Sequence, residues 1–202
     1  MNNISCDVVI LPERNLAAKA ICASQSLREF DAYYTLEQDT YFPHVSLYML
    51  ELNTRDISKA EELLTGIATE FSSFQLEAYR YDHTLGYIDA EYRKFIELDD
   101  LQVRVIKALS PIRDGMREKD KVRMLNAEGQ ALKNFQDYGY QNVGQLFRPH
   151  ISFTRLRETN DSAIHELGNV TSFSGTFLRL GLFEMGENGT CVRNIKTFNF
   201  LG

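Results

Sequence analysis

Hydrophobic and polar positions along the chain predict a mixture of strands and helices. Seven segments are rich in β-branched and aromatic residues or alternate apolar and polar residues, which is typical of strands. They are residues 4–11, 42–52, 74–81, 86–91, 147–156, 174–184 and 191–201. Five further segments repeat apolar residues every three or four positions, as amphipathic helices do. They are residues 15–30, 56–71, 93–109, 127–138 and 160–167. Residues 113–124 are the most charged stretch and could form either a loop or an exposed helical piece.

The order of these predicted elements repeats once along the chain. In each half a helical segment precedes a strand that carries Pro-His, and a helix and a hairpin follow that strand. No Pro-, Gly- or Ser-rich linker separates the halves, so a duplicated element order indicates one compact unit. We therefore predict an α+β fold in a single bilobal domain over residues 1–202. Two antiparallel sheets should face each other across a central cleft, with the helices on the outside.

Two of the four histidines occupy matched positions in this repeat, in the sequences Pro43-His44-Val45-Ser46 and Pro149-His150-Ile151-Ser152. Side chains at positions i and i+2 of a strand point to the same face. His44 therefore shares a face with Ser46, and His150 shares one with Ser152. A pseudo-twofold arrangement of the halves would bring both imidazoles and both hydroxyls to one cleft.

Two imidazoles that flank a phosphodiester can act as an acid–base pair. A neutral histidine accepts a proton from water or a ribose hydroxyl, and a protonated histidine donates one to the leaving oxygen. Ser46 and Ser152 could donate hydrogen bonds to the phosphate oxygens, where charge develops. This chemistry needs no metal, and no His or Cys pair has the spacing of a zinc site. We expect neither a metal nor a cofactor.

Neighbouring strand positions supply three further candidates. Arg148 shares the face of His150 and could bind the substrate phosphate. Phe42 and Tyr48 share the face of His44 and could stack on a base, or they could equally belong to the core. Arg155 has the opposite parity and should face away from the site unless a β-bulge intervenes.

The paired H-x-S motifs in a duplicated α+β chain resemble the 2H phosphoesterase superfamily, which includes 2′-5′ RNA ligase-like and cyclic nucleotide phosphodiesterase proteins. His44, Ser46, His150 and Ser152 match the family motif. The resemblance implies a metal-independent phosphodiesterase that hydrolyses a 2′,3′-cyclic phosphate or a related 2′-linked diester of a nucleotide or RNA end. The histidines are 150 − 44 = 106 residues apart, a longer spacing than we expect for the smallest members of the family. We expect the additional residues to lie in the segment 113–144.

Two alternatives remain open at this point. The same chemistry could run in the direction of 2′-5′ RNA ligation, or the chain could be a non-catalytic RNA-binding, nucleotide-binding or scaffold module. The sequence does not assign which histidine is the acid. It also does not choose between a mononucleotide, an RNA end, a cyclic oligonucleotide and a nucleotide-derived small molecule.

Charge is unevenly distributed along this acidic chain, whose net charge is −6. That value argues against a protein that coats nucleic acid through bulk charge. Residues 103–157, however, carry 11 basic and 5 acidic side chains, 11 − 5 = +6. This excess fits either a local site for an anionic ligand or an ordinary solvated face.

The remaining features indicate a protein of a reducing compartment. Cys6, Cys22 and Cys191 are far apart and form no disulfide or metal pattern. No apolar run approaches the roughly 20 residues of a membrane span, and the first residues show no secretory signal. We expect a cytoplasmic monomer that has a nucleotide or an RNA end as its substrate, with no membrane association and no obligatory protein partner.

Overall fold

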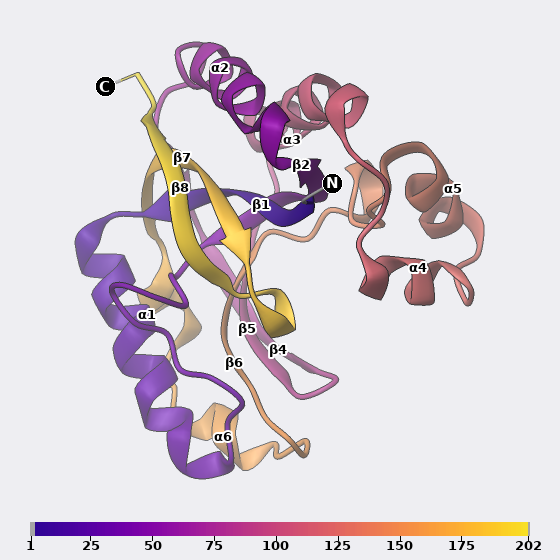
Figure 1. Ribbon diagram of the computed structural model, residues 1–202. Helices are drawn as coiled ribbons and strands as arrows, with labels where there is room; N and C mark the ends of the chain where they lie inside the picture. Colours follow the sequence, from indigo (N-terminus) through magenta and orange to yellow (C-terminus); the bar gives the residue numbers. More distant parts are fainter. Residues whose placement is uncertain (1–2, 202) are drawn as a thin grey trace.

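The computed structural model describes residues 3–201, so three residues of the predicted 1–202 domain lie outside it. Its strands form two antiparallel sheets (Figure 1), as the sequence predicted. The five-stranded sheet has the order β2-β1-β7-β3, with β8 also paired to β7. Its strands are β1 (Asn3–Pro12), β2 (Val45–Asn53), β3 (Phe74–Leu76), β7 (Gly175–Met185) and β8 (Cys191–Asn199). The three-stranded sheet has the order β4-β5-β6 and contains β4 (Ala78–Thr84), β5 (Tyr87–Tyr92) and β6 (His150–Arg155).

In the part of the chain that the structure describes, six α-helices lie around the sheets (Figure 1). They are α1 (Arg14–Ser26), α2 (Ile57–Ala68), α3 (Ile96–Leu109), α4 (Glu118–Met124), α5 (Gly129–Tyr138) and α6 (Ser162–His165). Helices α2 and α3 pack on each other and against strands of the five-stranded sheet, whereas α1 contacts β6. Helices α4 and α5 pack together on one side of the molecule. Within residues 3–201 no helix is both long and apolar enough to span a bilayer.

The two sequence halves exchange their hairpins. The β4–β5 hairpin of the first half pairs with β6, the histidine strand of the second half. The β7–β8 hairpin of the second half pairs through β7 with β1, which lies beside β2. Each histidine motif therefore lies in a sheet that contains strands from both halves of the chain.

Several predicted elements differ from the structure in their boundaries. The predicted strand 74–81 is divided at Glu77, because β3 joins the five-stranded sheet and β4 joins the three-stranded sheet. The alternation of apolar and polar residues continues across this break, so periodicity alone could not show it. The predicted helix 15–30 begins at Arg14 and continues after Ser26 as a 3-10 turn. Of residues 113–124, predicted as a loop or an exposed helical piece, the second part forms α4.

A β-bulge follows the serine in β2. Val8 of β1 lies opposite Tyr48, and Val9 lies opposite Ser46, so Leu47 is the extra residue. Such a bulge reverses the face to which the following side chains point. Leu47 and Tyr48 are accordingly both fully buried.

The same irregularity occurs in β6. Ile88 of β5 lies opposite Thr154, and Asp89 lies opposite Ser152, so Phe153 is the extra residue. The two motif strands therefore share not only the H-x-S sequence but also the position of the bulge. Both bulges change the face of the residues that follow the serine, while His and Ser keep a common face.

The hairpin between β4 and β5 turns tightly next to β6. Leu85 and Gly86 both have positive φ values, 54° and 83°, as the two central residues of a type I′ turn require. A Cβ at Gly86 would lie 2.4 Å from the carbonyl oxygen of Leu156. Glycine at this position therefore allows the turn to approach the end of β6.

Candidate active site

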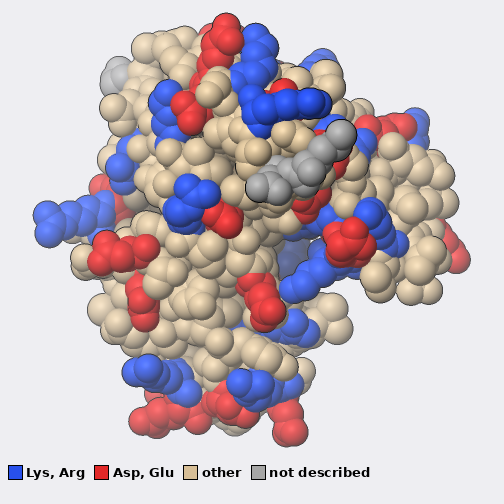
Figure 2. Space-filling model, in the orientation of Figure 1, with Lys and Arg blue, Asp and Glu red and all other residues tan. Residues whose placement is uncertain are grey.

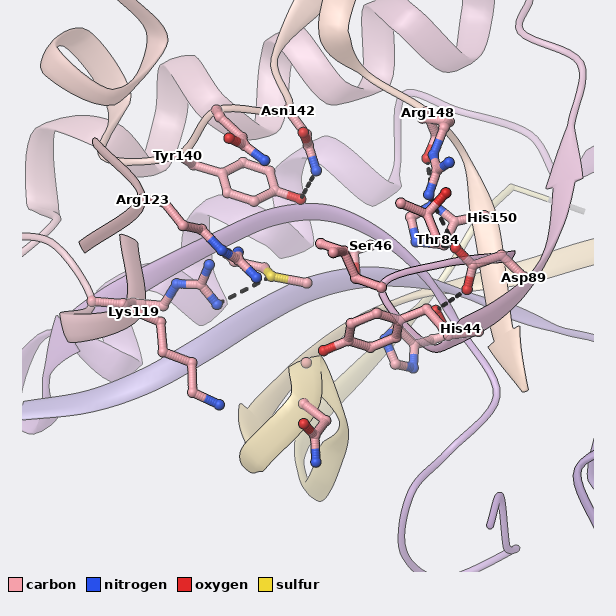
Figure 3. A pocket seen from close by; sticks show the side chains of 18 residues that line it. His44, Ser46, Thr84, Asp89, Lys119, Arg123, Tyr140, Asn142, Arg148 and His150 are labelled. Atoms are coloured by element: carbon pink, nitrogen blue, oxygen red, sulfur yellow. Dashed lines mark hydrogen bonds and ion pairs between the residues drawn. The ribbon is translucent and has the colours of Figure 1, made fainter. Parts of the chain in front are cut away.

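The four motif residues line one cavity of about 250 Å³ between the two sheets (Figure 3). His44 and Ser46 reach it from the start of β2, and His150 and Ser152 reach it from β6. The structure thus brings together the side chains that strand periodicity grouped in two pairs. Their catalytic roles remain a prediction.

Each imidazole is fixed by a carbonyl two residues earlier in the chain. Nδ1 of His44 donates to the Phe42 carbonyl oxygen at 2.6 Å, and Nδ1 of His150 donates to the Arg148 carbonyl oxygen at 2.6 Å. A carbonyl can only accept, so Nδ1 carries a proton in both residues. Nε2 is therefore the atom that remains available for proton transfer.

Each serine donates to a carboxylate on the neighbouring strand. Ser46 Oγ donates to Oδ2 of Asp7 at 2.6 Å, and Ser152 Oγ donates to Oδ1 of Asp89 at 2.6 Å. The same carboxylates approach the histidines, with Nε2–Oδ2 distances of 3.7 Å for His44 and Asp7 and 3.8 Å for His150 and Asp89. Each half-site is therefore a His-Ser-Asp cluster.

Sequence reasoning missed both aspartates, although each left a signal. Asp7 is a charged residue within the apolar run of β1, and Asp89 stands between two apolar residues of β5. A buried carboxylate is costly unless it is paired or protonated, so such a position suggests a functional group. The two clusters are not equivalent in register, because Asp7 lies opposite Met49 whereas Asp89 lies directly opposite Ser152.

Burial shifts the proton equilibria of the first cluster in opposite directions. Burial raises the pKa of Asp7 to about 7, against the hydrogen bond from Ser46 and the charge of Arg117. Burial lowers the pKa of His44 to about 4, against the hydrogen bond to the Phe42 carbonyl. Between these values the carboxyl holds a proton and the imidazole is neutral. The 3.7 Å contact is then one between neutral groups rather than an ion pair.

The second cluster is more strongly charged. Burial raises the pKa of Asp89, while His150, Ser152 and Arg148 oppose that shift. The His150 side chain is 23% exposed, against 12% for His44. The two histidines therefore occupy different environments despite their matched motifs.

Arg148 lines the cavity, as predicted, but its charge is already balanced by three carboxylates. Its guanidinium contacts Oδ2 of Asp82 at 2.8 Å, Oδ2 of Asp89 at 3.0 Å and Oε1 of Glu91 at 2.7 Å. These contacts favour a role in holding Asp89 in place. The predicted phosphate contact has no support from this arrangement.

The two aromatic candidates do not line this cavity, so of the two possibilities given for them the structure favours the core over stacking on a base. Tyr48 is fully buried and donates its hydroxyl to the Tyr138 carbonyl oxygen at 2.7 Å. The bulge at Leu47 turns it away from the site. Phe42 packs on Phe183 with ring centroids 5.1 Å apart, and it precedes β2, so strand parity does not apply to it.

Arg155 lies near the cavity because the bulge at Phe153 changes its face. It donates to Oδ1 of Asn188 at 2.9 Å, and its guanidinium carbon is 5.1 Å from the centroid of the Tyr87 ring. Both of these partners line the cavity. The sequence placed Arg155 away from the site unless a β-bulge intervened, and the structure has such a bulge at Phe153.

A wall of the cavity comes from the segment 113–144, which accounts for the long spacing between the histidines. Six lining residues belong to it: Arg117, Lys119, Arg123, Tyr140, Gln141 and Asn142. Figure 2 shows a hollow beside α4 and α5 with Lys and Arg side chains at its rim. The basic character of residues 103–157 is thus partly concentrated at the site.

One group of residues has the composition of a metal site. Asp7, His44 and Cys191 place potential ligand atoms within 4.8 Å of one another. Spacing along the chain could not reveal them, because they come from β1, the start of β2 and β8. Burial raises the pKa of the Cys191 thiol well above its ordinary value, so ion binding would require the release of protons from both Cys191 and Asp7.

Comparisons with known proteins identify the fold. No protein-family model and no curated protein matches the sequence. Among solved structures, LigT of E. coli in complex with 3′-AMP matches with a TM-score of 0.62 at 12% identity, over 100% of both chains. TT0787 of Thermus thermophilus matches with a TM-score of 0.61 at 13% identity, over 98% of this chain and 99% of that one.

A third solved structure, described as a phosphoesterase, matches with a TM-score of 0.61 at 12% identity over 100% of both chains. All three matches span both sheets and the connections between them. The chain therefore has the fold of LigT and of this phosphoesterase, which confirms the fold expected from the resemblance to 2H phosphoesterases.

Proposed function

We propose that the protein is a 2H-type phosphodiesterase that opens a 2′,3′-cyclic phosphate or cleaves a related 2′-linked diester of a nucleotide or RNA end. The observation that carries this proposal is the convergence of His44 and His150 on one cavity, each with Nδ1 anchored and Nε2 available. The fold shared with LigT supports it, since LigT has been solved with 3′-AMP, ATP and NADP+.

His44 is the general base in this proposal. Burial keeps its imidazole neutral at neutral pH, and a neutral Nε2 can accept a proton from water or a ribose hydroxyl. We assign the role of general acid to His150, the more exposed of the two imidazoles, whose Nε2 lies 3.8 Å from Oδ2 of Asp89. The two environments thus separate the roles that the matched motifs left unassigned.

The serines donate to the non-bridging phosphate oxygens. Ser46 donates to Asp7 in the free protein, so its hydroxyl proton must be redirected when substrate binds. A protonated Asp7 can donate to Ser46 Oγ instead, and this leaves the serine proton for the phosphate. The raised pKa of Asp7, about 7, makes that protonated form available near neutral pH.

The proposal is tested by turnover of adenosine 2′,3′-cyclic phosphate in the presence of EDTA. His44→Ala and His150→Ala should each lower kcat by roughly 10²–10⁴-fold, the usual contribution of a positioned proton donor or acceptor. His165→Ala is the control, because His165 is exposed on α6 and does not line the cavity.

Thermal unfolding and circular dichroism establish that the variants remain folded. Folded histidine variants that turn over the substrate at the wild-type rate would refute the proposal. Binding of the nucleotide without turnover by the wild-type protein would favour the non-catalytic module. Formation of a 2′-5′ bond from RNA ends would assign the ligase direction of the same chemistry.

A further inference from the structure

The wall of the cavity formed by the segment 113–144 carries cations that the proposed acid–base chemistry does not use. Lys119 and Arg123 lie on α4, and Arg117 directly precedes this helix. Figure 3 shows Lys119 and Arg123 on one side of the cavity and Arg148, Asp89 and His150 on the other, with Ser46 between them. The cavity therefore has two ends of different character.

The histidine end has no excess of positive charge. Its cluster of ion pairs contains two arginines and three carboxylates, 2 − 3 = −1, namely Arg80, Arg148, Asp82, Asp89 and Glu91. A protonated His150 would bring this end only to neutrality. A ligand with more than one negative charge therefore needs cations elsewhere in the cavity.

The α4 end has such an excess. Asp120 is fully buried and contacts both Arg117 and Arg123, the latter with an Nη1–Oδ1 distance of 3.3 Å. The side chain of Lys119 forms no ion pair with any residue between 3 and 201. Three cations against one carboxylate leave 3 − 1 = +2 at this wall.

Arg117 fixes this wall rather than offering its charge to a ligand. It is buried, donates to Oδ2 of Asp120 at 2.6 Å, and places Nη1 3.1 Å and 3.2 Å from the sulfurs of Met49 and Met185. Lys119 and Arg123 are exposed. The charges available to a ligand at the α4 end are therefore those of Lys119 and Arg123.

We propose that Lys119 and Arg123 bind a terminal phosphate monoester of the substrate, separate from the phosphodiester that reacts at the histidines. The inference rests on the proposed function. A phosphate monoester carries about −1.5 to −2 charges at pH 7, which complements the +2 of this wall. A nucleoside 2′,3′-cyclic phosphate has only its single diester charge and would leave the excess positive charge of this wall unbalanced.

The test compares adenosine 2′,3′-cyclic phosphate with the same compound bearing a 5′-phosphate. The wild-type protein should show a kcat/KM at least roughly tenfold higher for the 5′-phosphorylated compound, as expected for one or two charge-assisted hydrogen bonds. Lys119→Ala and Arg123→Ala should remove this preference, because kcat/KM for the 5′-phosphorylated compound falls to the value for the compound without 5′-phosphate. Lys121→Ala is the matched control, because Lys121 lies on α4, pairs with Glu118 and does not line the cavity.

Equal losses on both compounds would overturn the inference, since the cations would then serve the reacting phosphate. Absence of a wild-type preference would overturn it as well. If neither compound is turned over, the proposed function fails separately. Calorimetry with adenosine 3′,5′-bisphosphate and adenosine 3′-monophosphate then decides the inference, because tighter binding of the bisphosphate that depends on Lys119 supports it and equal affinity refutes it.

Discussion

Asp7 and His44 together hold one proton over a wide range of pH. In the folded protein the carboxyl keeps its proton up to a pKa of about 7, and the imidazole loses its own at about 4. In the unfolded chain the ordinary values are about 3.9 for Asp and about 6.5 for His. Between pH 4 and 6.5 each state therefore binds one proton at this pair, carried by Asp7 when folded and by His44 when unfolded. The pair as a whole contributes no pH dependence of stability in that window.

Replacement of Asp7 should reveal the pH dependence of stability that Asp7 and His44 cancel between them in the wild-type protein. Wild-type Asp7 binds more protons in the folded state, so its contribution to stability falls as pH rises from about 4 to about 7. Asp7→Asn removes that fall. The free energy of unfolding of the variant, relative to wild type, should rise with pH by at most about 1.4 kcal/mol per pH unit.

Urea denaturation at several pH values between 4.5 and 6.5 measures this difference. Asp31→Asn is the control, since the Asp31 side chain is 75% exposed. A difference between Asp7→Asn and wild type that stays constant over the window would show that Asp7 is ionised in the folded protein.

At the scale of secondary structure, Arg148 ties together the strands of the three-stranded sheet. It lies just before β6 and contacts Asp82 of β4 and both Asp89 and Glu91 of β5. Asp89 in turn accepts from Ser152. Removal of the guanidinium would deprive the buried carboxylate of Asp89 of its arginine partner, which is more costly than the loss of an exposed pair.

Arg148→Gln should therefore destabilise the protein by about 2 kcal/mol, a value below that for a fully buried pair because the Arg148 side chain is 40% exposed. It should lower kcat more than it raises KM, since Asp89 and Ser152 lose their support. Arg80→Gln is the control, because Arg80 also pairs with Glu91 but does not line the cavity. A raised KM with unchanged stability would instead restore Arg148 as a phosphate ligand.

The limits of sequence-based prediction in this chain follow from the geometry of its strands. Period-two alternation placed His44 and Ser46 together correctly, because no irregularity separates them. It failed for Tyr48, since a bulge changes the face of a strand without changing its pattern of residue types. The partners Asp7 and Asp89 come from strands adjacent in space, and pairing between strands is not encoded in the periodicity of either one.

The sequence did not distinguish helix α4 from a loop. The reason differs from the one that applies to the strands. With Val122 63% and Leu125 80% exposed, this segment has no apolar stripe facing a core. Its position depends instead on Arg117, whose buried contacts with Asp120 and two methionine sulfurs are long-range or polar. Contacts of this kind leave no hydrophobic periodicity in the sequence. Only the high charge of the segment indicated that it is exposed.

At the scale of the whole molecule, the exchange of hairpins makes the two sheets depend on each other. The β4–β5 hairpin lacks a third strand until β6 arrives from the second half of the chain. Strands β1 and β2 form only a two-stranded pair unless β7 of the second half pairs with β1. The histidines lie on different sheets, so the site forms only when both sheets are complete.

This interleaving predicts one cooperative unfolding transition rather than two. A two-stranded hairpin alone is at best marginally stable in water, and a histidine strand without its partners has no sheet to join. Far-UV and near-UV circular dichroism should therefore give coincident urea curves, the latter signal coming from tyrosines and phenylalanines because the chain has no tryptophan. The separate halves, residues 1–112 and 113–202, should each remain unfolded. Two resolved transitions, or a half that folds alone with its own cooperative curve, would mean that the sheets are independent units despite their shared strands.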